Sequence, residues 1–219
     1  MPSIVAILNS KGGSGKTTIA TNLARGLQRA GRSVLIADTD PQGTAAEWAN
    51  LRAEGSDLPP VVGVSKATLK EHMRDVGSAY DVVVMDGAAK LQAISVEALK
   101  VADVVLLPVR PSGADLWAVE DLVDLIHTRQ DVTGGRPAAA FVVSQQIVGT
   151  NLAGEVGDVL DAYELPVLDG RTSQRVAYTE ALSTGTTVLD MAAGSKAAAE
   201  VERITKNTLA LLESATQST

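Results

Sequence analysis

The sequence contains no cysteine in 219 residues, and aromatic side chains make up only 3% of it. The absence of cysteine excludes disulfides, zinc–thiolate sites and cysteine-ligated iron–sulfur clusters. The scarcity of aromatic residues disfavours single-strand nucleic-acid binding by base stacking. Basic residues are also outnumbered, with 19 Lys and Arg against 26 Asp and Glu and a pI near 4.9. This acidic balance disfavours constitutive nucleic-acid binding, which is typical of domains with a pI above about 9.

Long hydrophobic runs are absent as well, because no stretch approaches the roughly 20 apolar residues that a membrane helix needs. The apolar run at residues 4–8 is too short for a signal-peptide core and leads directly into glycines. We therefore expect a cytoplasmic protein that does not attach to membranes. Apolar residues make up 45% of the chain and charged residues 21%, which predicts a single globular domain over residues 1–219.

The charges are unevenly distributed along the chain. Residues 1–37 hold five basic residues and no acidic one, whereas residues 38–170 hold nine basic and 21 acidic residues. Residues 171–219 hold five of each kind. The net charge of −7 is therefore carried by the middle of the chain, and the N-terminal segment is suited to binding an anion.

Short apolar, β-branched runs alternate with longer segments of helical periodicity. The runs are nearly continuous in hydrophobicity, as in a parallel sheet that is covered on both faces. This order predicts an open, doubly wound, mostly parallel α/β sheet with helices on both faces. We predict strands at residues 3–9, 33–38, 61–64, 81–86, 103–109, 138–144 and 165–168. We predict helices at residues 17–30, 44–53, 66–76, 91–101, 114–129, 152–163, 173–182 and 195–214.

Residues 10–18 read Ser-Lys-Gly-Gly-Ser-Gly-Lys-Thr-Thr and join the first predicted strand to the first predicted helix. This is the context of a phosphate-binding loop, where glycines let backbone N–H groups surround an anion and the helix adds its dipole. Lys16 would place a positive charge at the β- and γ-phosphates of a nucleotide, and the Thr17 hydroxyl would ligate Mg²⁺. The predicted nucleotide-binding residues are Lys11, Gly12, Gly13, Ser14, Gly15, Lys16, Thr17 and Thr18.

Carboxylates stand at the ends of two further predicted strands. The second strand leads into the segment Asp38-Thr39-Asp40-Pro41-Gln42, and the strand at residues 81–86 ends in Asp86. A carboxylate at the carboxyl end of a parallel strand, beside a phosphate loop, can hold a Mg²⁺-bound water or orient an attacking water. These positions predict an acidic, metal-binding side of the nucleotide site.

The loop departs from the usual P-loop pattern, because Ser10 replaces a glycine and a second lysine, Lys11, follows it. This pattern, K-G-G-x-G-K-T, resembles the deviant Walker A motif of the ParA/MinD family of dimeric ATPases. The D-x-D-P-Q segment matches the family's switch segment. Asp86-Gly87-Ala88 resembles a small-plasmid partition subgroup typified by ParF, whereas many other members have Asp-Thr-Pro-Pro here. Further matches extend the resemblance over nearly the whole chain.

The resemblance implies an ATP- and Mg²⁺-dependent ATPase in which Lys11 reaches the nucleotide of a second subunit, so that ATP joins a homodimer. It also implies that Asp40 helps to position the hydrolytic water. The implied catalytic residues are Lys11, Lys16 and Asp40. The implied metal-site residues are Thr17, Asp38 and Asp86.

Family members that partition plasmids or chromosomes bind DNA without sequence preference in the ATP state, through basic residues near the C-terminus. Residues 171–178 resemble this segment, with Arg171 and Arg175 spaced i, i+4 on one side of a predicted helix start. A few arginines per subunit become effective once dimerisation doubles them, because phosphate neutralisation is additive and salt-sensitive. The resemblance further implies a ParB- or ParG-like partner that stimulates weak hydrolysis, and a cytoplasmic, nucleoid-associated location.

Two classes of function stay open. The first is an ATPase that partitions DNA or positions a protein cargo. The second is a dethiobiotin-synthetase-like ligase that uses the same loop to activate a carboxylate. Lys11 and the D-x-D-P-Q segment favour the first. A MinD-like septum-site ATPase is disfavoured, because the final predicted helix is alanine-rich, ends in a polar segment and lacks a bulky aromatic face for membranes.

Overall fold

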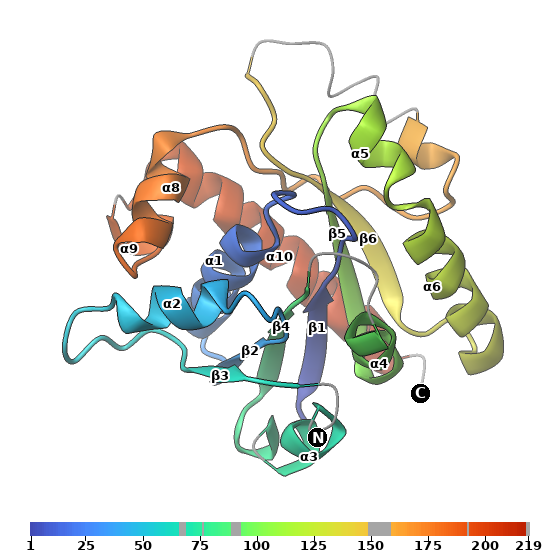
Figure 1. Ribbon diagram of the computed structural model, residues 1–219, viewed down its shortest axis with the longest axis horizontal. Coiled ribbons are helices and arrows are strands. Elements are labelled where there is room, and N and C mark those ends of the chain that lie inside the picture. The colour runs from blue at the N-terminus through green and yellow to red at the C-terminus, as the bar shows by residue number, and fades with distance from the viewer. Residues whose placement is uncertain (66–68, 76, 89–92, 149–158, 192, 218–219) are drawn as a thin grey trace.

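The computed structural model describes residues 1–65, 69–75, 77–88, 93–148, 159–191 and 193–217. Its centre is a six-stranded sheet of order β3-β2-β4-β1-β5-β6, in which each pair of neighbouring strands is parallel (Figure 1). The strands are β1 (Ser3–Ile7), β2 (Val34–Asp38), β3 (Val61–Gly63), β4 (Val82–Asp86), β5 (Val104–Val109) and β6 (Ala138–Val143). The predicted doubly wound α/β fold is confirmed.

Helices cover both faces of the sheet, because successive residues of a strand point to opposite sides. In β1, Ile4 and Ala6 pack into one hydrophobic cluster, and Val5 and Ile7 pack into another. The first cluster includes residues of α3 (Leu69–Asp75), α4 (Ala93–Val101) and α6 (Glu120–Thr133). The second includes residues of α1 (Lys16–Arg29), α2 (Thr44–Asn50) and α10 (Lys196–Gln217).

A third, smaller cluster joins α8 (Val176–Ser183) and α9 (Val188–Met191) to the beginning of α10. Two further helices are α5 (Gly113–Trp117) and the 3₁₀ helix η1 (Gly77–Ala79). Within the described residues, no helix combines the length and the apolar character that crossing a membrane requires.

Two predicted elements are wrong. The helix predicted at residues 114–129 is divided into α5 and α6, and at the break the Ala118 carbonyl accepts a hydrogen bond from the Ser10 hydroxyl. No strand forms at residues 165–168, where Val167 makes only an isolated parallel bridge with Phe141. Pro166 has no N–H group for a longer ladder.

The remaining predicted elements differ at their ends or fall partly outside the described residues. The helix predicted from residue 173 begins at Val176, so Arg171 and Arg175 do not share a helix face, and this prediction is wrong. Most of the predicted helix at residues 152–163 lies outside the described residues, as do the first residues of the helices predicted at 66–76 and 91–101.

The strand register brings the predicted site segments to one edge of the sheet. Asp86 is paired in register with Ile7 of β1 on one side and with Asp38 of β2 on the other. Because all three strands are parallel, the loop after β1 and both carboxylates lie at the same carboxyl edge. Figure 1 shows this loop at the upper end of β1, between α1 and α5.

Candidate nucleotide-binding site

The loop between β1 and α1 has the backbone geometry of an anion-binding site. Gly13 and Gly15 have left-handed φ angles of +73° and +95°, which favour glycine. A Cβ atom on Gly15 would lie 2.4 Å from the Ser144 hydroxyl oxygen, so the loop also packs too closely there for a side chain. Gly15 is the N-cap residue of α1, and no side chain caps this helix end. The free N–H groups at the start of α1 are therefore available to a phosphate.

The two lysines of the loop point in different directions. Lys16 is buried, and its Nζ donates a hydrogen bond of 3.0 Å to the Lys11 carbonyl within the loop. Burial lowers the pKa of Lys16, although the charges of Asp86 and Asp40 oppose this effect. The side chain of Lys11 is 33% exposed, and its Nζ lies 3.0 Å from Oδ1 of the buried Asp115. Lys16 thus faces its own loop, and Lys11 is directed out of it.

Asp86 is hydrogen-bonded directly to the start of α1, where the loop ends. Thr17 donates a hydrogen bond of 2.7 Å to Asp86 Oδ2, whereas the buried Oδ1 atom has no partner among the described residues. Burial raises the pKa of Asp86 to about 7. A hydroxyl, one carboxylate and nucleotide phosphates are a typical magnesium environment. The Thr17–Asp86 pair therefore fits Mg²⁺, although no group of three or more His, Asp or Glu that could hold a metal is found within the described residues.

Asp38 and Asp40 shape the segment that follows β2. The Asp38 carboxylate accepts hydrogen bonds from the backbone N–H groups of Asp40, at 3.1 Å, and Ala46, at 2.9 Å. Burial raises the pKa of Asp38. Because backbone N–H groups already occupy its carboxylate, Asp38 suits an indirect role in a metal site. Through its hydrogen bond to Ala46, it anchors α2 beside Asp86. Asp40 is partly exposed and accepts a hydrogen bond of 2.9 Å from the Gln42 N–H.

Gly87 explains the Asp-Gly-Ala form of the segment after β4. A Cβ atom on Gly87 would lie 2.4 Å from the carbonyl oxygen of Ile7 and 2.7 Å from the Leu8 side chain. The Gly87 N–H donates to the same Ile7 carbonyl at 3.1 Å. Close packing against β1 therefore requires glycine directly after Asp86.

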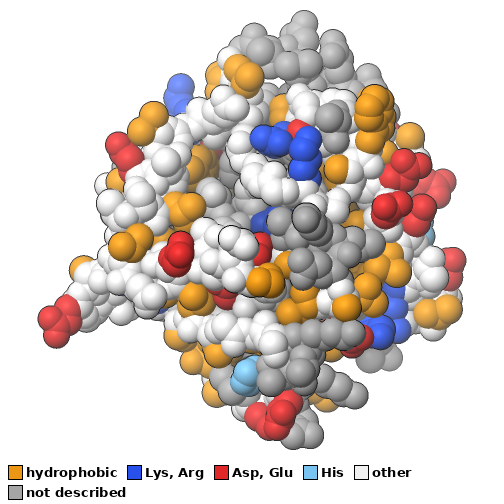
Figure 2. All heavy atoms as spheres, in the orientation of Figure 1, with side chains coloured by type: hydrophobic (Ala, Val, Ile, Leu, Met, Phe, Trp, Pro, Cys, Tyr) orange, Lys and Arg blue, Asp and Glu red, His pale blue; other side chains and the backbone are white. Residues whose placement is uncertain are grey.

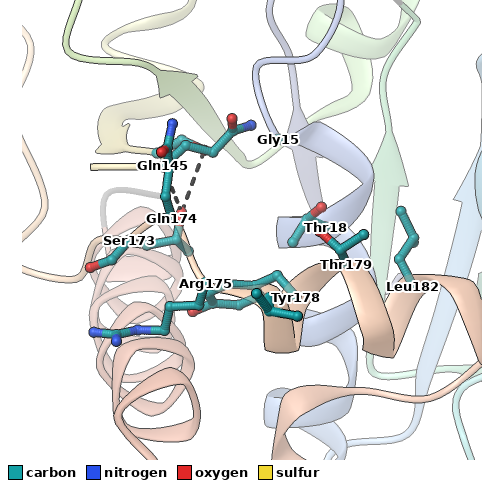
Figure 3. A pocket seen from close by; sticks show the side chains of 12 residues that line it. Gly15, Thr18, Gln145, Ser173, Gln174, Arg175, Tyr178, Thr179 and Leu182 are labelled. Atoms are coloured by element: carbon teal, nitrogen blue, oxygen red, sulfur yellow. Dashed lines mark hydrogen bonds between the residues drawn. The ribbon is translucent and has the colours of Figure 1, made fainter. Parts of the chain in front are cut away.

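A pocket of about 450 Å³ lies beside the loop. Gly15 and Thr18 line it on the loop side, and the turn after β6, the segment 172–176 and α8 line the rest (Figure 3). The sequence motifs predict no nucleotide-binding role for this second half of the pocket, although residues 171–178 resemble a DNA-binding segment. The sequence feature that could have indicated this part of the pocket is the polar run Ser144-Gln145-Gln146, which begins at the carboxyl end of a predicted parallel strand.

The two predicted DNA-binding arginines lie in different environments. Arg175 adopts an extended conformation before α8, and its Nη2 lies 2.6 Å from Oε1 of Glu200 on α10. Figure 3 shows Arg175 extending away from Gly15. Arg171 is partly exposed and makes no side-chain hydrogen bond or ion pair to another described residue. Gly170, its neighbour, packs against the backbone of Ile204 in α10.

Several charged side chains gather in groups on the surface. In the view of Figure 2, Lys and Arg side chains gather at the upper middle of the face, and Asp and Glu side chains gather at its right-hand side, where α6 begins. The exposed acidic residues of α6 are Glu120, Asp121, Asp124 and Asp131. This acidic face is unsuited to polyanions.

Comparison with known proteins agrees with this geometry. The family model described as "CobQ/CobB/MinD/ParA nucleotide binding domain" matches residues 5–206. The chain belongs to this family and is a ParA/MinD-type ATPase. The maintenance of carboxysome distribution protein A of Halothiobacillus neapolitanus is 31% identical over 91% of this chain and 93% of its own length. The chromosome-partitioning ATPase Soj of Thermus thermophilus is 34% identical over 60% of this chain and 63% of its own length.

Solved structures share the fold at low sequence identity. The cell division ATPase MinD of Pyrococcus furiosus superposes with a TM-score of 0.78 at 20% identity, over 96% of this chain and all of that chain. The cobyrinic acid a,c-diamide synthase of Mycobacterium smegmatis, with bound ADP and magnesium, superposes with a TM-score of 0.77 at 20% identity, over 98% of this chain and 96% of that chain. These likenesses support the fold.

Proposed function

We propose that this ATPase is an ATP-dependent homodimeric switch that binds DNA without sequence preference in its ATP state and segregates plasmid or chromosomal DNA. The observation that carries the proposal is the different orientation of the two loop lysines. Lys16 is directed into its own loop, whereas Lys11 lies outside it against Asp115. A lysine that its own phosphate cradle does not use could, once released from Asp115, reach a nucleotide bound by a second subunit.

The proposed nucleotide site occupies one ATPase domain over residues 1–219. Residues 11–18 would hold the phosphates, and the pocket beside Gly15 and Thr18 would hold the nucleoside. Thr17 and Asp86 would hold Mg²⁺, with Asp38 keeping the neighbouring segment in place. The ion would neutralise charge on the β- and γ-phosphates. The Asp86 Oδ1 atom, which has no partner in the part of the chain that the structure describes, supports this assignment.

Hydrolysis is proposed to be weak until a partner protein completes the site. Asp40 is partly exposed at the carboxyl edge, where its carboxylate could orient the attacking water. A cation such as an arginine from a ParB- or ParG-like partner would stabilise the charge that develops in the transition state. The switch would thus reset only where the partner is bound.

Arg171 is the better candidate for DNA contact, because Glu200 already neutralises Arg175. Arg171 lies beside α10, which also carries the exposed residues Lys196, Arg203 and Lys206. Each phosphate contact made by an arginine would be doubled in a dimer, and its loss would reduce the salt dependence of binding. We propose a nucleoid-associated, cytoplasmic location on the same basis.

A protein assembly is a second candidate cargo. The relative that matches over 93% of its own length is named for the maintenance of carboxysome distribution. The same switch could therefore position a protein cargo along DNA.

The test is DNA retardation with ATP, with ADP and without nucleotide. Wild type should bind best with ATP, and Lys11→Ala and Lys16→Ala should abolish this ATP dependence. Arg171→Ala should weaken binding and lower the salt slope by about one per contact, whereas Arg32→Ala, at an exposed arginine away from the site, should not. Binding that ignores nucleotide would contradict the switch. Nucleotide turnover that saturates with a small carboxylate substrate would support a ligase instead.

A further inference from the structure

We infer that Gln145 is a positioning residue of the phosphate loop, whose side-chain amide fixes the Gly13–Ser14 peptide so that the Ser14 N–H faces the phosphate. The inference rests on nucleotide binding by this loop, which the proposed function also needs. It assigns a task to the turn after β6, to which the sequence motifs give none.

The contact joins segments that are 132 residues apart in the chain. Gln145 Nε2 donates a hydrogen bond of 2.8 Å to the Gly13 carbonyl oxygen. In a planar trans peptide, the C=O of one residue and the N–H of the next point in opposite directions. Gln145 therefore holds the Gly13 carbonyl away from the loop interior and directs the Ser14 N–H inward. Gly13, whose φ angle is +73°, has no side chain to restrict the backbone, so without the contact this peptide could adopt other orientations.

The turn that carries Gln145 is held in an unfavourable conformation. Gln145 has a φ angle of +55°, which is uncommon for a residue other than glycine. Its N–H donates to Thr172 Oγ1 at 3.0 Å, and the Gln146 N–H donates to the Thr172 carbonyl at 2.8 Å. The segment after residue 171 thus keeps the turn in the conformation that aims Gln145 at the loop. Such a strained residue, maintained by its surroundings, is typical of functional sites.

The same turn contacts the loop at a second point. Ser144 lies so close to Gly15 that no Cβ atom fits between them. Ser14 is therefore flanked by two residues, Gly13 and Gly15, that both lie against the turn after β6. The Ser14 side chain is itself buried, and its hydroxyl has no partner among the described residues. Figure 3 shows Gln145 and Gly15 together at one end of the pocket.

A competing role for Gln145 is recognition of the base, because Gln145 also lines the pocket. The two roles differ in the part of the nucleotide that is affected. A residue that orients the loop changes the affinity for tripolyphosphate and for ADP alike, whereas a residue that contacts the base changes the affinity for ADP and leaves that for tripolyphosphate unchanged.

The experiment compares the affinities of tripolyphosphate and ADP, both with Mg²⁺, in competition with a fluorescent ADP. Gln145→Ala and Gln145→Gly should each lower the affinity for tripolyphosphate and the affinity for ADP by roughly 3- to 10-fold, which is the effect of losing one hydrogen bond. The matched control is Gln28→Ala, which removes a similar bond of 2.7 Å from an amide to the Asp57 carbonyl. This control should bind both ligands like wild type. Where Gln145→Ala does not fold, Gln145→Met keeps the side-chain length without the donor and gives the same measurement.

Three results would overturn the inference. Weaker ADP binding with unchanged tripolyphosphate binding would assign Gln145 to the base. Wild-type affinities in Gln145→Gly would show that the backbone conformation matters and the amide does not. Unchanged affinities in every folded variant would show that the contact is irrelevant to phosphate binding. DNA binding that ignores nucleotide would contradict the proposed function and leave this inference intact.

Discussion

Lys11 and Asp115 form an ion pair at the edge of the proposed nucleotide site, with 3.0 Å between Lys11 Nζ and Asp115 Oδ1. Asp115 also accepts a hydrogen bond of 3.1 Å from Arg110 Nη2 at its Oδ1 atom, and another from the Ser112 hydroxyl. Burial opposes ionisation of Asp115, but these donors together hold its pKa below the ordinary value. The ion pair keeps Lys11 against its own chain, so in the proposed dimer Lys11 would have to leave Asp115 before it reached the second subunit.

The substitution Asp115→Asn should therefore promote ATP-dependent dimerisation. It removes the negative charge that retains Lys11, while the amide oxygen can still accept a hydrogen bond from Ser112 or Arg110. We expect the Kd of the ATP-bound dimer to fall by roughly 3- to 10-fold, which corresponds to about 1 kcal/mol. Sedimentation velocity with ATP, ADP and no nucleotide measures this constant. An unchanged or weaker ATP-bound dimer would show that the ion pair does not oppose assembly.

Asp86 makes the nucleotide-free protein sensitive to pH. Its folded-state pKa of about 7 lies above the ordinary value near 4, so the folded chain binds the proton more tightly than the unfolded chain. The free energy of unfolding should therefore decrease as the pH rises from about 4 through the folded-state pKa of about 7, and this contribution should become level about one pH unit above that pKa. Asp86→Asn should stabilise the EDTA-treated protein by about 1–3 kcal/mol at pH 8.

Urea unfolding at several pH values measures this effect. The gain from Asp86→Asn should shrink as the pH falls and should be small near pH 4, where wild-type Asp86 is neutral in the folded state and about half protonated in the unfolded state. A variant that is less stable than wild type at pH 8, or a gain that does not depend on pH, would contradict the assignment of the proton to Asp86.

The sequence was sufficient to predict the loop and the two carboxylate segments. Residues 10–18 are contiguous, and their glycines and lysines carry the geometry locally. Asp38 and Asp86 each end an apolar run, and parallel strands bring their carboxyl ends to one edge whatever the details of packing. The same rule did not extend to residues 165–168, because a proline prevents the ladder from growing there.

Contacts between distant side chains could not be predicted in the same way. The bond from Gln145 to Gly13 and the ion pair of Lys11 with Asp115 depend on where three separate turns lie after folding. The prediction that Arg171 and Arg175 share a helix face is wrong for a related reason. Glu200, from a helix near the C-terminus, binds Ser173 and Arg175 and keeps this segment extended.

Trp48 links α2 to the segment before α9. Its indole N–H donates a hydrogen bond of 2.8 Å to the Thr186 carbonyl, and the Arg52 guanidinium lies 4.1 Å from the ring centroid. Trp48→Phe should remove the donor to the Thr186 carbonyl and create a small cavity beside it. We expect a loss of about 1–3 kcal/mol in the free energy of unfolding, measured by urea denaturation.

The chain offers a matched control, because it contains two tryptophans. Trp117 is 76% exposed, so Trp117→Phe should change the stability by less than about 0.5 kcal/mol. Each variant also leaves a single tryptophan, whose fluorescence reports on unfolding. Equal effects of the two substitutions would show that the Trp48–Thr186 bond does not stabilise the fold.

Glu200 stabilises the segment that borders the pocket. It accepts hydrogen bonds from the Ser173 hydroxyl at 2.7 Å, Arg175 Nη2 at 2.6 Å and the Tyr178 hydroxyl at 2.8 Å. Burial alone would raise the pKa of Glu200, but the hydrogen bonds from Arg175 and Ser173 hold it below the ordinary value. The folded chain therefore binds this proton less tightly than the unfolded chain, and the stabilisation is present above about pH 4 and lost as the pH falls further.

Glu200→Gln should lower the free energy of unfolding by about 1–3 kcal/mol at pH 7, because the charge-assisted bonds to Arg175 and Ser173 weaken. Glu202→Gln is the matched control, since Glu202 is an exposed residue of the same helix. The difference between wild type and Glu200→Gln should diminish below about pH 4, where wild-type Glu200 also becomes protonated. Urea unfolding of the three proteins at pH 7 and at pH 3.5 measures both effects. A difference that persists undiminished at the lower pH would show that the Glu200 charge is not its source.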